Sequence, residues 1–165
     1  MPLPQFNEAL RDAELTEQDA VPLVEQLLVR YGLGHYKYCS KQEYPAQYTN
    51  LKSQDLVFSD GEKFLLIEVK DNKSSQRTGN VAFEYECSGK PSCLAVTESP
   101  LWVVRYFDTT WKFQVVLTSR LLQEWKSEKY RSVKMGDKDN TGTPRAVGFL
   151  VPVSEFKTWG LTLGN

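Results

Sequence analysis

The sequence has few of the residues on which several familiar kinds of site depend. It contains three cysteines, Cys39, Cys87 and Cys93, without CxxC spacing, and one histidine, His35. Zinc centres use cysteine and histidine ligands, and Ser-His-Asp or Cys-His hydrolases need a histidine base, so the sequence favours neither class. The odd number of cysteines also argues against a disulfide framework, and we expect reduced thiols and a cytoplasmic location.

Long apolar runs and a strong net charge are also missing. No window approaches the roughly 20 apolar residues of a membrane-spanning helix, and the first 20 residues lack the pattern of a secretion signal, so we expect no membrane partner. The net charge is −1. Residues 1–19 are mainly acidic and residues 120–145 mainly basic. One face could therefore bind a polyanion, although two charged surfaces in contact with solvent explain the pattern more simply.

The length fits one domain. A chain of 165 residues can bury its own core, and it shows no internal repeat. We therefore expect residues 1–165 to form a single α/β domain with a mixed central sheet flanked by helices. Residues 1–18 are expected to be a polar, weakly helical lead-in. Residues 126–145 are expected to be a flexible basic loop, either solvated or in contact with a DNA backbone.

Periodicity and turn residues predict the individual elements. Residues 19–31 have the spacing of an amphipathic helix, which Gly32 can end. Two apolar runs lie on either side of Asp60-Gly61, a turn typical of a β-hairpin. Residues 80–87 are expected to be a helix capped by Thr78 or Asn80. The remaining expectations are a short strand after residue 35, a loop at 45–53, strands at 92–97, 101–107, 111–117 and 145–153, and helices at 118–131 and 154–160.

Two charged residues interrupt the second strand of the predicted hairpin. Because side chains alternate along a strand, Glu68 and Lys70 share the face opposite the main apolar row. Asp55 opens the preceding strand, which the tight turn folds back alongside. Two carboxylates and an ammonium group would then converge at one end of the hairpin. The alternative interpretation is a charged pair that protects an edge strand from aggregation.

Converging carboxylates favour a hard divalent cation. Like charges repel at short range, and Mg²⁺ commonly takes one or two protein carboxylates together with waters and phosphate oxygens. A neighbouring lysine can hold or help deprotonate a metal-bound water. The set therefore predicts metal-assisted hydrolysis of a phosphodiester, with Mg²⁺ as the cofactor and Mn²⁺ as a substitute.

The pattern Asp55, twelve residues, then Glu68-Val69-Lys70 resembles the PD-(D/E)xK nuclease superfamily. That group has a restriction-endonuclease-like core of the order αβββαβ and includes restriction enzymes, phage exonucleases and archaeal-type Holliday-junction resolvases. Small phage nucleases look most similar. The resemblance covers residues 20–105 and departs from the family pattern where Gln54 replaces a proline. It implies an endonuclease that acts on branched DNA during recombination, as a monomer or homodimer, in a bacterial or phage-infected cell.

The resemblance also implies roles for single residues. Asp55, Glu68 and the intervening Val69 would form the metal site, and Lys70 would be the catalytic lysine. Glu25 is the candidate for the acidic residue that many members carry on the preceding helix, although an exposed helix glutamate is the plainer interpretation. The segment after the lysine supplies the expected contacts to DNA: Lys73, Arg77, Thr78, Asn80, Glu84 and Lys90. A helix that starts at Thr78-Gly79-Asn80 would offer free backbone amides to a phosphate, although the segment can equally be a plain helix start.

Two other classes of function stay open. A nuclease fold without catalysis would bind DNA or a protein and cleave nothing. A small interaction domain would use aromatic surface and would bind no divalent metal. The four tryptophans are expected in the core or at an interface rather than as platforms for base stacking.

Overall fold

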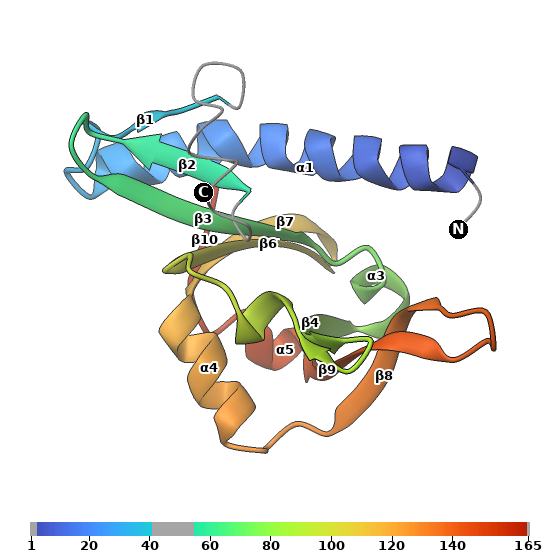
Figure 1. The fold of residues 1–165 in the computed structure, drawn as a ribbon. Helices are drawn as coiled ribbons and strands as arrows, with labels where there is room; N and C mark the ends of the chain where they lie inside the picture. Colours follow the sequence, from blue (N-terminus) through green and yellow to red (C-terminus); the bar gives the residue numbers. More distant parts are fainter. Residues whose placement is uncertain (1–2, 41–54, 165) are drawn as a thin grey trace.

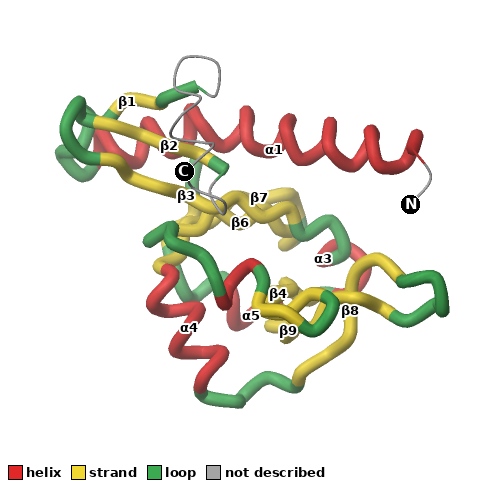
Figure 2. The backbone as a smooth tube through the Cα atoms, in the orientation of Figure 1, coloured by secondary structure: helices red, strands yellow, loops and turns green. Residues whose placement is uncertain are grey.

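The computed structural model describes residues 3–40 and 55–164. A long helix covers one face of a six-stranded sheet, and a four-stranded sheet with two helices lies beneath the other face (Figure 1). Figure 2 shows the same arrangement by secondary structure. In chain order the elements are α1 (Leu3–Arg30), β1 (Lys37–Tyr38), β2 (Leu56–Ser59), β3 (Phe64–Asp71), α3 (Ser75–Thr78), β4 (Asn80–Cys87), β5 (Lys90–Pro91), the 3₁₀ helix η1 (Cys93–Ala95), β6 (Leu101–Asp108), β7 (Thr110–Leu117), α4 (Thr118–Lys126), β8 (Ser132–Lys138), β9 (Pro144–Pro152), α5 (Val153–Phe156) and β10 (Leu161–Thr162).

Helix α1 is longer than the sequence predicts. The expected lead-in is helical from residue 3, and the helix continues for 28 residues. Its C-terminal half is anchored by Ala20, Val24 and Leu28, which are buried against the first sheet. Gly32, with a φ of 74°, follows the helix in the left-handed conformation that the sequence predicts. Within the described residues, no helix is long and apolar enough to cross a membrane.

The first sheet is mixed, as expected, with the order β1-β2-β3-β6-β7-β10. The predicted hairpin of β2 and β3 is confirmed, with Leu56 opposite Ile67 and Ser59 opposite Phe64. Strands β6 and β7 form a second hairpin, and β6 runs parallel to β3. The chain between β3 and β6 crosses beneath the sheet, so β3 receives partners from both sides and becomes an interior strand.

The second sheet, of the order β5-β4-β9-β8, corrects three predictions. Residues 80–87 are a strand, because the alternation that buries Val81 and Phe83 has the period of a strand, not of a helix. Residues 126–145 are not a flexible loop, since most of β8 pairs with β9. Residues 92–97 contain η1 instead of a strand, with Leu94 buried beneath. The predicted strand at 145–153 is confirmed as β9, whereas the helices predicted at 118–131 and 154–160 are α4 and α5, each shorter than expected.

Two buried clusters lie on opposite faces of the first sheet. One joins α1 to the first sheet through Val24, Ile67 and Val103. The other joins the two sheets, where Phe83 of β4 meets Trp102 of β6 with ring centroids 6.0 Å apart. The second cluster therefore fixes the second sheet against the face of the first sheet that carries the even-numbered residues of β3 and β6.

Replacing Gly160 with alanine is expected to destabilise the protein by about 3 kcal/mol or more, because a Cβ atom there would lie 1.9 Å from the backbone oxygen of Val115. Neither strand can give way, since Leu161 pairs with Val115 in the same sheet. Urea denaturation measures the loss. Gly34→Ala is the control: the nearest atom to its Cβ would be a methyl group of exposed Val29, at 3.1 Å, so we expect a change below about 1 kcal/mol. Equal effects of the two substitutions would contradict the close approach of β10 to β7.

Candidate functional site

Asp55 lies near Glu68 at the open end of the β2–β3 hairpin. It immediately precedes β2, whose first residue, Leu56, pairs with Ile67. Asp55 N–H donates to the Ile67 carbonyl at 3.2 Å, and Val69 N–H donates to Asp55 Oδ2 at 2.7 Å, so the two contacts of Asp55 fall on either side of Glu68. The charge of Asp55 raises the pKa of Glu68, which agrees with two carboxyl groups that lie near each other.

Lys70 shares the face that carries Glu68. In the parallel register Glu68 lies beside Trp102 and Lys70 beside Val104, and both of these β6 residues belong to the cluster between the sheets. Ile67 belongs instead to the cluster beneath α1. The alternation predicted from the sequence is therefore present, and it directs the charged pair toward the second sheet. Because β6 covers the other edge of β3, the pair does not lie on an edge strand, which removes the alternative interpretation for these two residues.

The Glu68 carboxyl group is in an environment that disfavours its ionised form. Its Oε2 atom is buried and has no hydrogen-bond partner among residues 3–40 and 55–164. Burial raises the pKa of Glu68 to about 8, the charges of Asp55 and Glu17 raise it as well, and Lys70 opposes them. A carboxyl group of this kind needs either a proton or a nearby cation.

Of the two helix glutamates, Glu17 and not Glu25 has a charge that acts on Glu68. Glu17 is half-buried. Glu25 is exposed and lines a different pocket with Lys37, which pairs with Ser59 at the opposite end of β2 from Asp55. The two glutamates are eight residues apart, or about 12 Å along a helix. Glu17 was not predicted, because the apolar periodicity indicates a helix only from residue 19, whereas α1 begins at Leu3.

The second sheet brings a further set of polar groups toward Glu68. The Ser92 hydroxyl donates to Glu84 Oε1 at 2.8 Å. Burial raises the pKa of the nearby Cys93 thiol, the charges of Glu84 and Glu68 raise it as well, and the Ser92 hydroxyl and Lys70 lower it. Cys93 therefore lies within electrostatic range of Glu84 on one side and of the Glu68–Lys70 pair on the other. Glu84 was predicted from the sequence, whereas Ser92 and Cys93 carried no signal.

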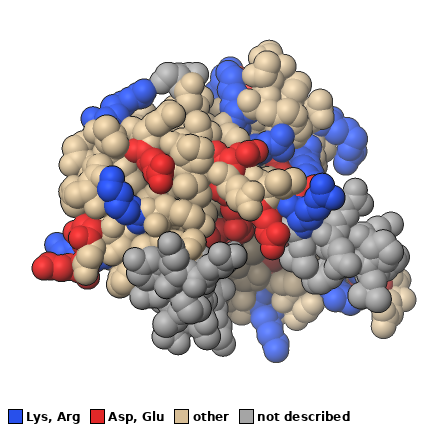
Figure 3. Space-filling model, turned by 90° about the horizontal axis from the view of Figure 1, so that it is seen from above, with Lys and Arg blue, Asp and Glu red and all other residues tan. Residues whose placement is uncertain are grey.

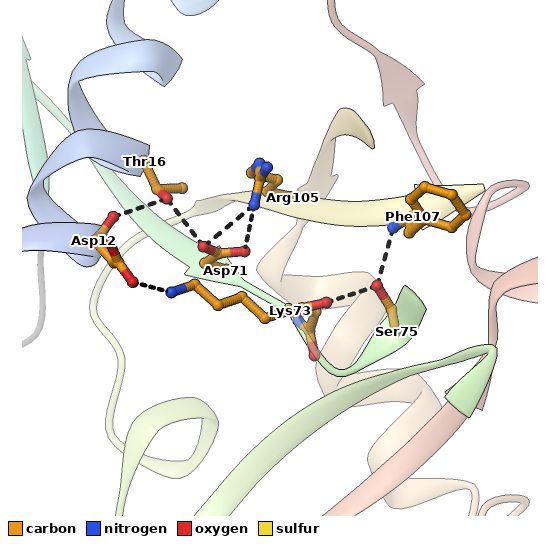
Figure 4. A network of polar contacts seen from close by, with 8 residues as sticks. Asp12, Thr16, Asp71, Lys73, Ser75, Arg105 and Phe107 are labelled. Atoms are coloured by element: carbon orange, nitrogen blue, oxygen red, sulfur yellow. Dashed lines mark hydrogen bonds and ion pairs between the residues drawn. The ribbon is translucent and has the colours of Figure 1, made fainter. Parts of the chain in front are cut away.

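A network of polar contacts next to Lys70 holds the N-terminal half of α1 in place (Figure 4). Asp71 accepts a hydrogen bond from the Thr16 hydroxyl at 3.1 Å and lies 3.1 Å from the Arg105 guanidinium of β6. Lys73, predicted as a DNA contact, instead pairs with Asp12 of α1. These contacts join α1 to two strands of the first sheet immediately after Lys70. They also fix the helix at Thr16, the residue before Glu17.

The chain after Asp71 is tied to both sheets by side-chain hydrogen bonds. The Ser75 hydroxyl donates to the Asn72 carbonyl at 2.6 Å and accepts from Phe107 N–H of β6 at 2.9 Å (Figure 4). The Asn72 amide oxygen accepts from Ala82 N–H of β4 at 2.8 Å. Strand β4 is thereby attached at the end of β3, which accounts for the approach of Glu84 to the hairpin.

The other predicted DNA contacts lie on the surface around α3 and β5. No helix begins at Thr78: α3 ends there, and Gly79 follows with a φ of 67°. The Asn80 side chain donates to the Thr78 carbonyl at 2.9 Å, so it closes the turn into β4. Arg77 and Lys90 are exposed. The predicted phosphate site at a helix N-terminus is therefore wrong for this segment, because the amides of a starting helix are not there.

The site offers a metal two nearby carboxylates. Within the described part of the chain, no group of three or more acidic, histidine or cysteine side chains has the geometry to hold a metal ion. Mg²⁺ accepts one or two carboxylates and completes its shell with water, so the orphaned Glu68 oxygen and Asp55 fit that ion. Acidic side chains gather near the middle of the face in Figure 3, with basic side chains beside them.

Comparisons with known proteins add no family to this description. No protein-family model, curated protein or solved structure matches the chain. What the site can do follows from its own chemistry.

Proposed function

We propose that the protein is a Mg²⁺-dependent DNA nuclease whose reaction takes place at Asp55, Glu68 and Lys70. The observation that supports this proposal most is the buried Oε2 atom of Glu68, which has no hydrogen-bond partner among the described residues and lies near the carboxylate of Asp55. The raised pKa of Glu68, about 8, is consistent with a group that binds a cation during function. Mn²⁺ is expected to substitute for Mg²⁺.

Each residue of the set has a distinct task in hydrolysis. Asp55 and Glu68 would hold the ion, which when bound polarises a phosphoryl oxygen and makes bound water a stronger nucleophile. Val69 N–H orients the Asp55 carboxylate through their 2.7 Å hydrogen bond. Lys70, on the same face as Glu68, orients the attacking water and offsets the negative charge that grows on the phosphate.

The order of the elements supports the proposal in part. Helix α1 precedes three strands that pair in sequence, and β6 then lies parallel to β3, which agrees with the αβββαβ order of PD-(D/E)xK nucleases. The crossover differs, because α3 is four residues long and the second sheet takes the place of the expected long helix. An endonuclease for branched DNA, of the Holliday-junction resolvase kind found in phage and in recombination, is the form that the resemblance favours. In that form the protein would act as a homodimer.

The proposal is tested with labelled linear, single-stranded, flapped and four-way DNA, each incubated with Mg²⁺, Mn²⁺ or a chelator. We expect cleavage with either metal and none with the chelator. Glu62→Gln, at an exposed position in the hairpin turn, is the matched control and should cut as the parent does. DNA binding without cleavage under all conditions would overturn the proposal in favour of a non-catalytic binding module.

A further inference from the structure

A second pocket, of about 550 Å³, opens between the end of α4 and the start of β8. Its walls combine aromatic rings with positive charge: Tyr85, Trp125, Tyr130, Phe149, Lys126 and Arg131. A volume of this order suits a small organic ligand such as a nucleotide. The pocket is separate from the group around Glu68, and no task in the proposed reaction uses it.

The aromatic side chains form flat, ordered surfaces. The rings of Tyr85 and Trp125 stack with their centroids 4.7 Å apart and their planes 24° apart. Tyr130 stacks in the same way on Phe149, at 5.9 Å and 21°. Tyr85 is held further by a 2.7 Å hydrogen bond between its hydroxyl and that of Ser132. All four rings line the pocket, and Tyr85, Trp125 and Tyr130 are only half-buried, so they present preorganised aromatic surface.

The charges at the pocket favour an anion. Lys126 and Arg131 are exposed, and within residues 3–40 and 55–164 neither forms an ion pair. Lys129, which lies between them in the sequence, forms an ion pair with Glu155, with 2.8 Å between Nζ and Oε2. Glu128 is the only acidic residue in the lining. Two available cations beside stacked rings suit a phosphate and the base attached to it.

We infer that this pocket binds an unpaired nucleotide of the DNA on which the protein acts, an inference that rests on the proposed function. In a duplex the faces of the bases are covered by their neighbours, so an aromatic surface can stack only on a base that is single-stranded. Among branched DNAs, the substrate would then be one that carries a single-stranded segment, such as a flap, rather than a fully paired four-way junction.

Strand β4 connects the pocket to the group around Glu68. Tyr85 lines the pocket, and its neighbour Glu84 belongs to the group beside Cys93. Ser92, which donates its hydroxyl proton to Glu84, also donates its backbone N–H to the Tyr85 carbonyl at 2.9 Å. A DNA strand held at the pocket would therefore pass over the second sheet to reach Asp55 and Glu68.

The test measures binding of a labelled single-stranded oligonucleotide in chelator, where no cleavage occurs. Lys126→Ala/Arg131→Ala should weaken binding by roughly tenfold or more and should lower the slope of log K against log salt by about 1 to 2. Lys37→Ala/Lys63→Ala removes two exposed lysines from the other end of the molecule and should bind as the parent does. Trp125 fluorescence, assigned with Trp125→Phe, should change with the oligonucleotide and much less with the same sequence as a duplex.

The outcomes separate this inference from the proposed function. Unchanged binding by Lys126→Ala/Arg131→Ala, or an equal response to duplex, would overturn the inference even if the protein cleaves DNA with Mg²⁺. If that variant lost binding and the parent cleaved no DNA under any condition, the results would support nucleotide binding at the pocket and overturn the proposed nuclease activity.

Discussion

Glu68→Gln is expected to abolish Mg²⁺-dependent cleavage and to make the protein more stable than the parent at alkaline pH. Glutamine has the shape of a protonated glutamate, so it fills the half-buried position without the charge that burial and Asp55 disfavour. It cannot supply a carboxylate to a cation. The same substitution should therefore remove the reaction and improve the fold, a combination that a purely structural glutamate would not give.

The stability of the parent protein is expected to fall as the pH rises. The pKa of Glu68 is raised from 4.5 to about 8 by folding, so the folded protein keeps a proton that the unfolded chain has released. The stabilising contribution is complete below about pH 4.5 and is lost progressively as the pH rises through about 8. One pKa unit corresponds to about 1.4 kcal/mol, so we expect the parent to lose a few kcal/mol between pH 5 and 9.

Denaturation of parent and variant across this pH range measures the effect. The free energy of unfolding of Glu68→Gln should vary less with pH than that of the parent, and the two values should diverge above about pH 6. Glu62→Gln, at an exposed position in the hairpin turn, should follow the parent. Mg²⁺ binding should become tighter as the pH rises toward 8 and should release a proton near pH 7, which calorimetry in buffers of different ionisation enthalpy detects. If the free energy of unfolding changed with pH equally in the parent and in Glu68→Gln, the raised pKa of Glu68 would be contradicted.

Asp55→Asn is expected to lower cleavage by about three orders of magnitude or more while the fold is retained. The asparagine oxygen can still accept the hydrogen bond from Val69 N–H, so the end of the hairpin keeps its geometry. One of the two charges available to the ion is lost. The substitution also removes the negative charge of Asp55 that repels ionised Glu68. The variant should therefore lose less stability than the parent as the pH rises.

Metal titration and cleavage assays separate this effect from that of the lysine. Asp55→Asn should weaken Mg²⁺ binding, whereas Lys70→Ala should retain Mg²⁺ binding and lose cleavage. Circular dichroism of both variants should match the parent. Cleavage by Asp55→Asn at the parent rate would show that the reaction takes place elsewhere on the molecule.

The hairpin and its charged pair could be predicted because the information is local. Asp60-Gly61 sets the turn, and the pairing of β2 with β3 that follows brings Asp55, just before β2, near Glu68. The second sheet could not be predicted in the same way. Strand β8 has little apolar character, and it is a strand because β9 offers it backbone partners. In 80–87 the alternation of a strand was present, but the capping residues before it suggested a helix.

The place of α1 in the site was likewise a long-range property. Its N-terminal half is polar, so periodicity indicates a helix only from residue 19. What holds this half against the sheet is contact with distant residues, Thr16 with Asp71 and Asp12 with Lys73. Such pairs have no signature in the local sequence. Glu25 was predicted in place of Glu17 because the N-terminal half of α1, which carries Glu17, was not predicted as part of the helix.

The pairing of β4 with β9 has a consequence for the time at which the site is completed. The β2–β3 hairpin is synthesised well before β9 (Pro144–Pro152), the long partner of β4. Until β9 docks, Val81 and Phe83 lack their cover, and Glu84 and Cys93 lack a fixed position beside Glu68. A nascent chain therefore carries both carboxylates of the hairpin before its site is complete, and the site can form only after β9 has been synthesised.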